Sequence, residues 1–201
     1  MTRQPADANR FYPGDPQELS RTVQRLLPAD PAEKRKALGV VSPHAGYIYS
    51  GAMAGRTIGS VHIPRTVIIL GPNHHGRGAA AAISTSTWQM PGGVVPCASE
   101  TAESLIEASE LFTDDELAHQ FEHSIEVKVP FLQELQQELQ IVAISLSSLS
   151  YQDCVEIGRA IAEVIEQADD DMLILASTDM SHYESRTNAS AKDKRALDRV
   201  L

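Results

Sequence analysis

The stretch of sequence that decides the fold is residues 66–76, TVIILGPNHHG. Residues 66–70 are consecutive apolar or β-branched residues, which is typical of a strand buried on both faces of a sheet. The chain then turns at Gly71 and Pro72 into a segment that carries His74 and His75. We therefore predict a buried strand that ends in a histidine-bearing loop.

The same order of apolar run and polar loop occurs twice more. Residues 38–41 read as a buried strand that leads to His44, and residues 172–176 lead to Asp179 and His182. Helical patterns occupy residues 16–27, 51–60, 99–108, 123–139 and 151–165. Further strand patterns occupy residues 81–88 and 140–146. Pro130 should kink or restart the helix predicted at 123–139. This alternation predicts an α/β fold with a largely parallel or mixed central sheet and helices on both faces.

Bulk properties narrow the class of protein. The 201 residues, of which 42% are hydrophobic, suit one domain spanning 1–201. No apolar run approaches the ~20 residues of a membrane span, and the polar first residues lack the core of a secretory signal, so we expect no membrane association and a cytoplasmic location. A net charge of −10 with scattered basic residues argues against nucleic-acid binding. Cys97 and Cys154 are expected to be reduced packing residues.

The histidines carry the functional prediction. In open α/β sheets the binding crevice lies beyond the carboxyl ends of the strands, so His44, His74 and His182 should meet at one edge. Imidazole is a common ligand of divalent metals and titrates near neutrality, which suits metal binding or proton transfer. Glu122, Glu126 and Asp179 are the acids available to orient such rings.

Each of these residues also has an ordinary structural explanation. A single histidine at a strand end is usually a turn residue, Asp179 can cap a helix, and Tyr47 can pack in the core. Glu122 and Glu126 also fit one face of a solvated helix.

The remaining histidines are interpreted from their positions. Neighbouring side chains in an extended loop point in opposite directions, so at most one of His74 and His75 is a metal ligand. His62 and His119 follow no strand end, and we expect both on the surface.

Several segments together resemble the Memo-like family, the B component of the AmmeMemoRadiSam system of prokaryotes. The matching segments are RFYP at 10–13, PHAGY at 43–47, ILGPNHHG at 69–76, EHSIE at 122–126, PFL at 130–132 and STDMSHY at 177–183. They cover nearly the whole chain in the family's order.

This resemblance implies a fold similar to the catalytic subunits of class III extradiol ring-cleaving dioxygenases, which are α/β proteins with non-haem iron(II). It implies that His44 and His74 bind a metal ion, either iron(II) or copper. It further implies catalytic roles for His123, Asp179 and His182, with His182 or His123 as the acid or base. The substrate-binding residues expected in the same pocket are Tyr47, Asn73, His75 and Glu126.

The chain departs from the family pattern at its end. Family members continue beyond the equivalent of Leu201 and supply a cysteine ligand from a Cys-Gly motif there. Neither Cys97 nor Cys154 matches that motif, so we expect a domain without the family's C-terminal portion. Its third ligand is left open, with Asp179 or water as the alternatives.

Three functions remain open on this basis. The leading hypothesis is a metal-dependent redox protein, dioxygenase-like, acting on an unidentified small molecule or a dioxygen species. The second is an adaptor that binds a peptide or phosphopeptide in the same pocket without chemistry. The third is metal-assisted hydrolysis with Glu126 or Asp179 as the base. A second copy of the chain, in a homo-oligomer, is a further candidate partner.

Overall fold

A mixed six-stranded sheet forms the centre of the computed structural model, which describes residues 1–29 and 34–199. The strands lie in the order β2 (Gly39–Ser42), β9 (Met172–Ser177), β3 (Thr66–Pro72), β8 (Gln140–Leu146), β4 (Ala81–Ser84) and β7 (Phe112–Asp114). Neighbouring strands are parallel except β4 and β8, which are antiparallel. The carboxyl ends of β2, β9 and β3 therefore lie side by side.

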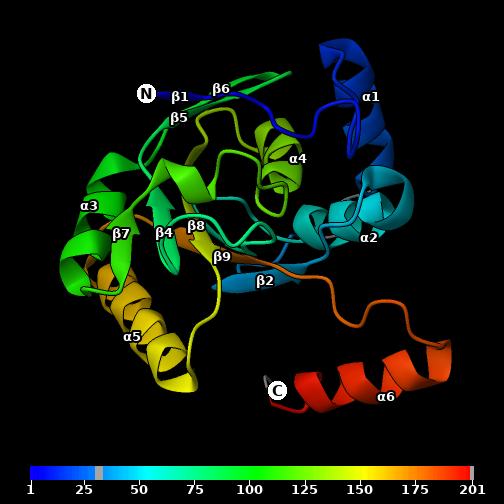
Figure 1. Ribbon diagram of the computed structural model, residues 1–201. Coiled ribbons are helices and arrows are strands. Elements are labelled where there is room, and N and C mark those ends of the chain that lie inside the picture. The colour runs from blue at the N-terminus through cyan, green and yellow to red at the C-terminus, as the bar shows by residue number, and fades with distance from the viewer. Residues whose placement is uncertain (30–33, 200–201) are drawn as a thin grey trace.

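Helices cover both faces of this sheet (Figure 1). One face packs against α1 (Pro16–Leu26), α2 (Tyr47–Gly59) and α4 (Val129–Leu135), and the other packs against α3 (Ser99–Ala108) and α5 (Tyr151–Gln167). Successive residues of β3 serve the two cores, because Val67 and Ile69 join one apolar cluster and Ile68 joins the other. The predicted α/β class, with a mixed sheet between two helical layers, is confirmed.

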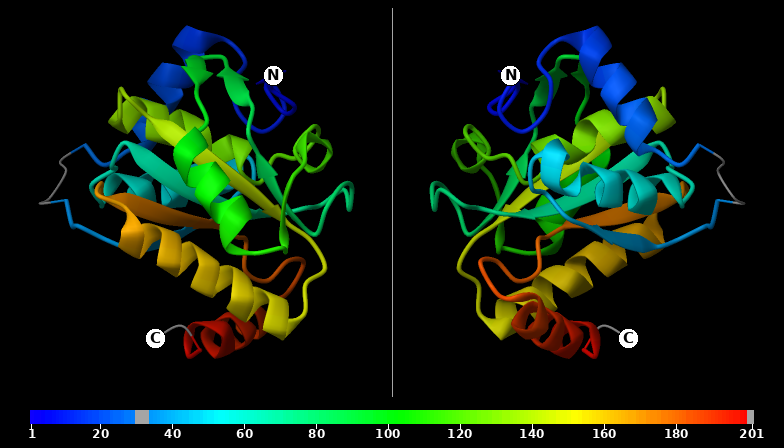
Figure 2. Two further views of the ribbon diagram at one scale, coloured as in Figure 1. Left: turned by 90° about the vertical axis from the view of Figure 1, so that its left-hand side faces the viewer. Right: turned by 90° about the vertical axis from the view of Figure 1, so that its right-hand side faces the viewer.

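Two parts of the chain belong to neither the central sheet nor its helical layers, and the first of them packs into the core on the α1 side. A small second sheet contains β1 (Thr2–Arg3), β5 (Thr87–Met90) and β6 (Gly93–Val95) in the order β1-β5-β6. Helix α6 (Arg186–Leu197) has no buried residue and lies away from the central sheet, as Figure 2 shows. Among the residues that the structure describes, no helix has the length and apolarity needed to cross a membrane.

Local signals explain where several helices begin. The Asp15 side chain accepts a hydrogen bond from the Glu18 amide at the start of α1, and Ser150 forms a capping box with Asp153 at the start of α5. The helix predicted at 123–139 is divided into a 3-10 turn, η2 (Glu126–Lys128), and α4. Pro130 lies in the first turn of α4, where its missing amide hydrogen is tolerated.

Some predictions about burial are wrong. Strand β2 lies at the edge of the sheet and its Val41 is 53% exposed, because a short apolar run does not distinguish an edge strand from a central one. His119 is completely buried, and its Nε2 contacts the Ala82 carbonyl oxygen at 3.0 Å, so it is not a surface residue. Cys154 is exposed and therefore packs in neither core.

Candidate metal centre

Three imidazoles from separate loops meet above the carboxyl edge of the sheet. His44 follows β2, His74 follows β3, and His123 lies between the 3-10 turn η1 (Glu116–Ala118) and η2. One ligand atom from each of the three lies within 4.8 Å of the others. The rings of His74 and His123 stack at 4.6 Å, and His44 meets both rings edge-on at 5.2 and 5.7 Å. The structure thus brings together the two predicted ligands and adds His123, whereas it leaves His75 outside the group.

The Nδ1 atom of each ring faces a protein oxygen. Nδ1 of His44 lies 3.2 Å from Oγ of Ser177, and Nδ1 of His74 lies 2.9 Å from Oε1 of Glu122. Nδ1 of His123 lies 3.5 Å from the same Glu122 oxygen. Hydrogen bonds such as those of His44 and His74 fix the tautomer and the orientation of metal-binding histidines, and the His123 contact has the same direction. We infer that Nε2 is the atom each ring offers to a metal.

Glu122 joins the two loops that carry His74 and His123. Its side chain is 1% exposed, and its oxygens accept hydrogen bonds from the His74 amide at 2.6 Å and the Ser124 amide at 2.8 Å. Burial raises the pKa of the Glu122 carboxyl, but the bonds from the His74 ring and these amides outweigh burial, so the pKa lies below its usual value. Glu122 is therefore an anion that orients the rings of His74 and His123.

We expect Glu122→Gln to weaken metal binding by about 10- to 100-fold, the usual effect of removing the hydrogen-bond partner of a ligating histidine. The amide nitrogen of glutamine cannot accept the bonds that a carboxylate oxygen accepts. Affinity should be measured by competition with a chelator, and Glu138→Gln, at an exposed position, is the control. Equal affinities in the two variants would contradict the orienting role.

The protein environment keeps two of the rings neutral. The pKa of His44 is lowered to about 4, chiefly by burial; Asp179 opposes this lowering, and the charges of Lys128, His74 and His123 contribute to it. Burial also lowers the pKa of His123, against the opposing charge of Glu122. Neutral imidazole is the form that binds metal, so these rings are ready to act as ligands at neutral pH.

Asp179 extends the cluster toward solvent. Its Oδ1 accepts hydrogen bonds from the His44 amide at 2.6 Å and the Ala45 amide at 3.3 Å. Its Oδ2 lies 3.9 Å from Nε2 of His44 and 3.4 Å from Nε2 of His182. Burial raises the pKa of Asp179, but its interactions with the His44 ring and with the two amides outweigh burial and lower it. An anionic oxygen therefore lies beside the imidazoles.

Comparison with known proteins identifies the family of the chain. The family profile described as Memo-like protein matches residues 3–201. The chain belongs to the Memo-like family. It is 40% identical to a MEMO1 family protein of Methanopyrus kandleri, aligned over 100% of this chain and 76% of that protein. Proteins with the same family description from Methanococcus maripaludis and Aquifex aeolicus are 38% and 39% identical, over 100% and 96% of this chain and 77% and 72% of theirs.

Two of the residues expected to bind substrate in this Memo-like chain are closed off from the cluster. Glu126 is completely buried, and its carboxylate accepts hydrogen bonds from the Arg3 side chain, the amides of Ala6 and Asp7 and the Tyr12 hydroxyl. These contacts fasten the N-terminal segment to η2. They do not fit the substrate-binding role, or the role of a hydrolytic base, that was expected of Glu126.

Tyr47 is also buried away from the histidine cluster. Asn73 and His75 lie in the loop that follows β3 and carries His74. The Tyr47 side chain is buried, and its hydroxyl donates to the Val127 carbonyl at 2.9 Å, so substrate binding does not fit it either. Asn73 shapes its own loop by donating to the Arg77 carbonyl and accepting from the His75 amide. His75 is exposed beside the cluster, where a role in substrate binding stays a prediction.

We expect Glu126→Gln to lower the free energy of unfolding by about 2 kcal/mol, because it removes the buried charge that pairs with Arg3 and leaves hydrogen-bond donors unsatisfied. Urea unfolding measures this loss. Glu110→Gln, at an exposed position, should leave the free energy of unfolding within about 0.5 kcal/mol of the parent. A similarly small loss in Glu126→Gln would refute the fastening role.

Lys128 is a buried residue near the cluster that sequence patterns did not reveal. Its side chain is completely buried, and its Nζ lies 3.3 Å from Oγ of Ser42. Burial lowers its pKa to about 7, with Asp179 opposing. A lysine within an apparent helix is usually solvated, so nothing in the sequence separates Lys128 from its exposed counterparts.

Proposed function

We propose that this Memo-like chain binds a redox-active metal, iron(II) or copper, through His44, His74 and His123, and acts on a small molecule there. The observation that supports this is the placement of three ligand atoms within 4.8 Å of one another. Imidazole suits iron, copper and zinc. Three imidazole ligands fill only part of the coordination sphere of the ion, as catalytic sites require.

The surrounding residues suit proton transfer at this centre. A bound iron(II) or copper ion would supply redox chemistry toward dioxygen or an organic substrate. We assign the acid or base role to His182, because its side chain is 55% exposed and can exchange protons with solvent. Asp179 would stabilise the imidazolium of His182 from 3.4 Å. His123 suits this role less well, because its ring is already part of the cluster.

One observation favours metal-assisted hydrolysis as a second candidate. Three histidines are also the ligand set of catalytic zinc in one class of hydrating enzyme, and Oδ2 of Asp179 accepts no hydrogen bond from the described residues. Asp179 could then take a proton from an attacking water. Turnover that continues without oxygen would favour this reaction.

The test begins with metal analysis of protein purified without chelator. We expect about one metal ion per chain in the parent and in His62→Ala, an exposed histidine outside the cluster, and much less in His123→Ala. Oxygen consumption with catechol-like substrates should then follow metal content. Absence of metal from the parent after reconstitution with iron(II) and copper would refute the proposal. Peptide binding that survives alanine at His44 and His74 would support the adaptor function instead.

A further inference from the structure

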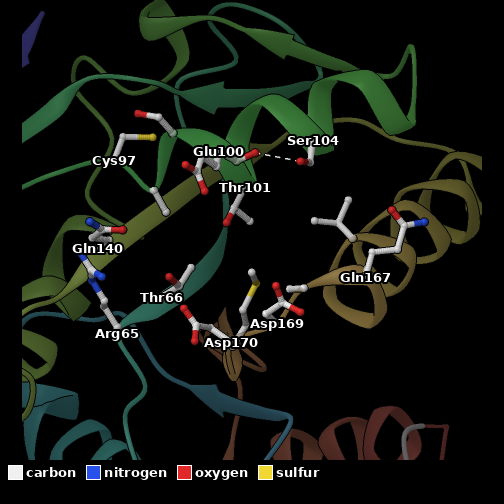
Figure 3. A pocket seen from close by; sticks show the side chains of 15 residues that line it. Arg65, Thr66, Cys97, Glu100, Thr101, Ser104, Gln140, Gln167, Asp169 and Asp170 are labelled. Atoms are coloured by element: carbon white, nitrogen blue, oxygen red, sulfur yellow. Dashed lines mark hydrogen bonds between the residues drawn. The ribbon is translucent and has the colours of Figure 1, made fainter.

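A second hollow lies at the opposite end of the sheet from the histidines. It has a volume of about 660 Å³ and forms where β3, β8 and β9 begin, between the N-terminus of α3 and the C-terminus of α5. Figure 3 shows the side chains around it. The lining residues used below are Arg65, Thr66, Glu100, Thr101, Asp169 and Asp170.

One side of the hollow is positively polarised. Ala98 precedes α3 and cannot cap it, and no side chain of the described residues does so. The first amides of a helix lack partners within the helix, and together with the helix dipole they attract anions. Arg65 lines the same hollow and forms no ion pair with any described residue. These groups suit a carboxylate.

The other side is negatively polarised. Helix α5 ends at Gln167 without a basic residue in its last turn, so no side-chain charge compensates the negative end of its dipole. Asp169 and Asp170 follow directly, and neither forms an ion pair within the described part of the chain, whereas Asp171 pairs with Lys36. These groups suit an ammonium.

Two largely buried threonines between these sides provide an independent indication of a ligand. Thr66 and Thr101 are only 9% and 8% exposed, yet neither hydroxyl has a hydrogen-bond partner among residues 1–29 and 34–199. Both side chains line the hollow, and the Thr101 hydroxyl points into it (Figure 3). Neither oxygen is among the fully enclosed unpartnered atoms of the described residues, so both are reached from the hollow and can bond to a molecule held there.

We propose that this hollow binds a small zwitterion, a free α-amino acid or a dipeptide. Its carboxylate would lie at the N-terminus of α3 near Arg65, and its ammonium near Asp169 and Asp170. Glu100 lies in the first turn of α3, so the hollow carries three carboxylates against one guanidinium, which disfavours a multiply charged phosphate. The volume lies within the range of small-molecule sites.

Nuclear magnetic resonance titration of the ¹⁵N-labelled chain in the presence of a chelator tests this proposal. The probes are the free amino acids and glycylglycine, each compared with its N-acetyl and its carboxamide derivative. We expect saturable shifts in the amides of residues 99–101 and 167–170, with affinity at least about tenfold weaker for either derivative. Arg65→Gln and Asp170→Asn should each weaken the binding of the zwitterion by a similar factor.

Matched variants distinguish binding in this hollow from binding elsewhere on the protein. Arg159→Gln alters an exposed arginine of α5 that does not line the hollow, and His44→Ala alters the histidine cluster, so both should bind the zwitterion like the parent. Arg65 and Asp170 are exposed, so their variants should fold. The proposal is overturned if no amino acid or dipeptide gives saturable shifts up to about 10 mM. Equal binding of the singly charged derivatives, or shifts with magnesium alone, would also overturn it.

Discussion

Replacing His44 by alanine is expected to weaken metal binding by at least about a hundredfold, because one of three ligands contributes about 3 kcal/mol to such a site. His44 is almost completely buried, and its amide and its ring are held by Asp179 and Ser177, so its ring is fixed in the cluster. Isothermal titration with iron(II) under anaerobic conditions, or with copper, measures the loss.

The best control for His44→Ala is His75→Ala. His75 neighbours His74 in sequence but lies outside the group whose ligand atoms converge. Its replacement should change affinity less than about threefold. Equal losses in the two variants would mean that the chain binds metal through scattered surface histidines.

Replacing Lys128 by methionine is expected to stabilise the protein at pH 7 by about 3 kcal/mol, because methionine fills a similar volume without a buried amine. The Lys128 ammonium donates a hydrogen bond to Ser42, and Asp179 compensates its charge only in part. Urea unfolding in the presence of a chelator measures the gain. The control is Lys36→Met, which removes only an exposed ion pair with Asp171 and should change stability little.

Lys128 should also make the stability of the protein depend on pH. Burial lowers the pKa of Lys128 from 10.5 to about 7, so between these values the unfolded chain binds more protons than the folded chain. The penalty is fully present below about pH 7, and stability should rise as the pH increases from 7 toward 10.5. The slope approaches about 1.4 kcal/mol per pH unit. In Lys128→Met the rise in stability between pH 7 and 10.5 should disappear. If Lys128→Met is less stable than the parent at pH 7, the buried amine does not destabilise the fold.

The positions of His44 and His74 at strand ends could be predicted because they depend on short, local sequence patterns. Apolar runs identify β3 and β9, and parallel strands place the loops that follow them at one edge. The meeting of His44 and His74 could therefore be expected from the sequence. The edge position of β2 could not be predicted, because burial of a strand depends on which strands flank it.

The position of the His123 ring in the cluster, and the contacts of the buried Glu126, depend on tertiary structure that sequence spacing does not reveal. His123 follows no strand, and it reaches the cluster because Glu122 is bonded to the His74 loop. Membership in a matching motif did not reveal that Glu126 points toward Arg3 and the N-terminal segment. Spacing along a chain does not specify which way a side chain points in an irregular segment.

Anomalous X-ray diffraction from metal-loaded crystals, recorded at the absorption edge of the bound metal, tests the three-histidine metal centre most directly. We expect one peak at a coordination distance of about 2.0–2.2 Å from Nε2 of His44, His74 and His123 together. A peak bound by His44 and His74 with the His123 ring turned away, or a peak elsewhere on the protein, would contradict this centre.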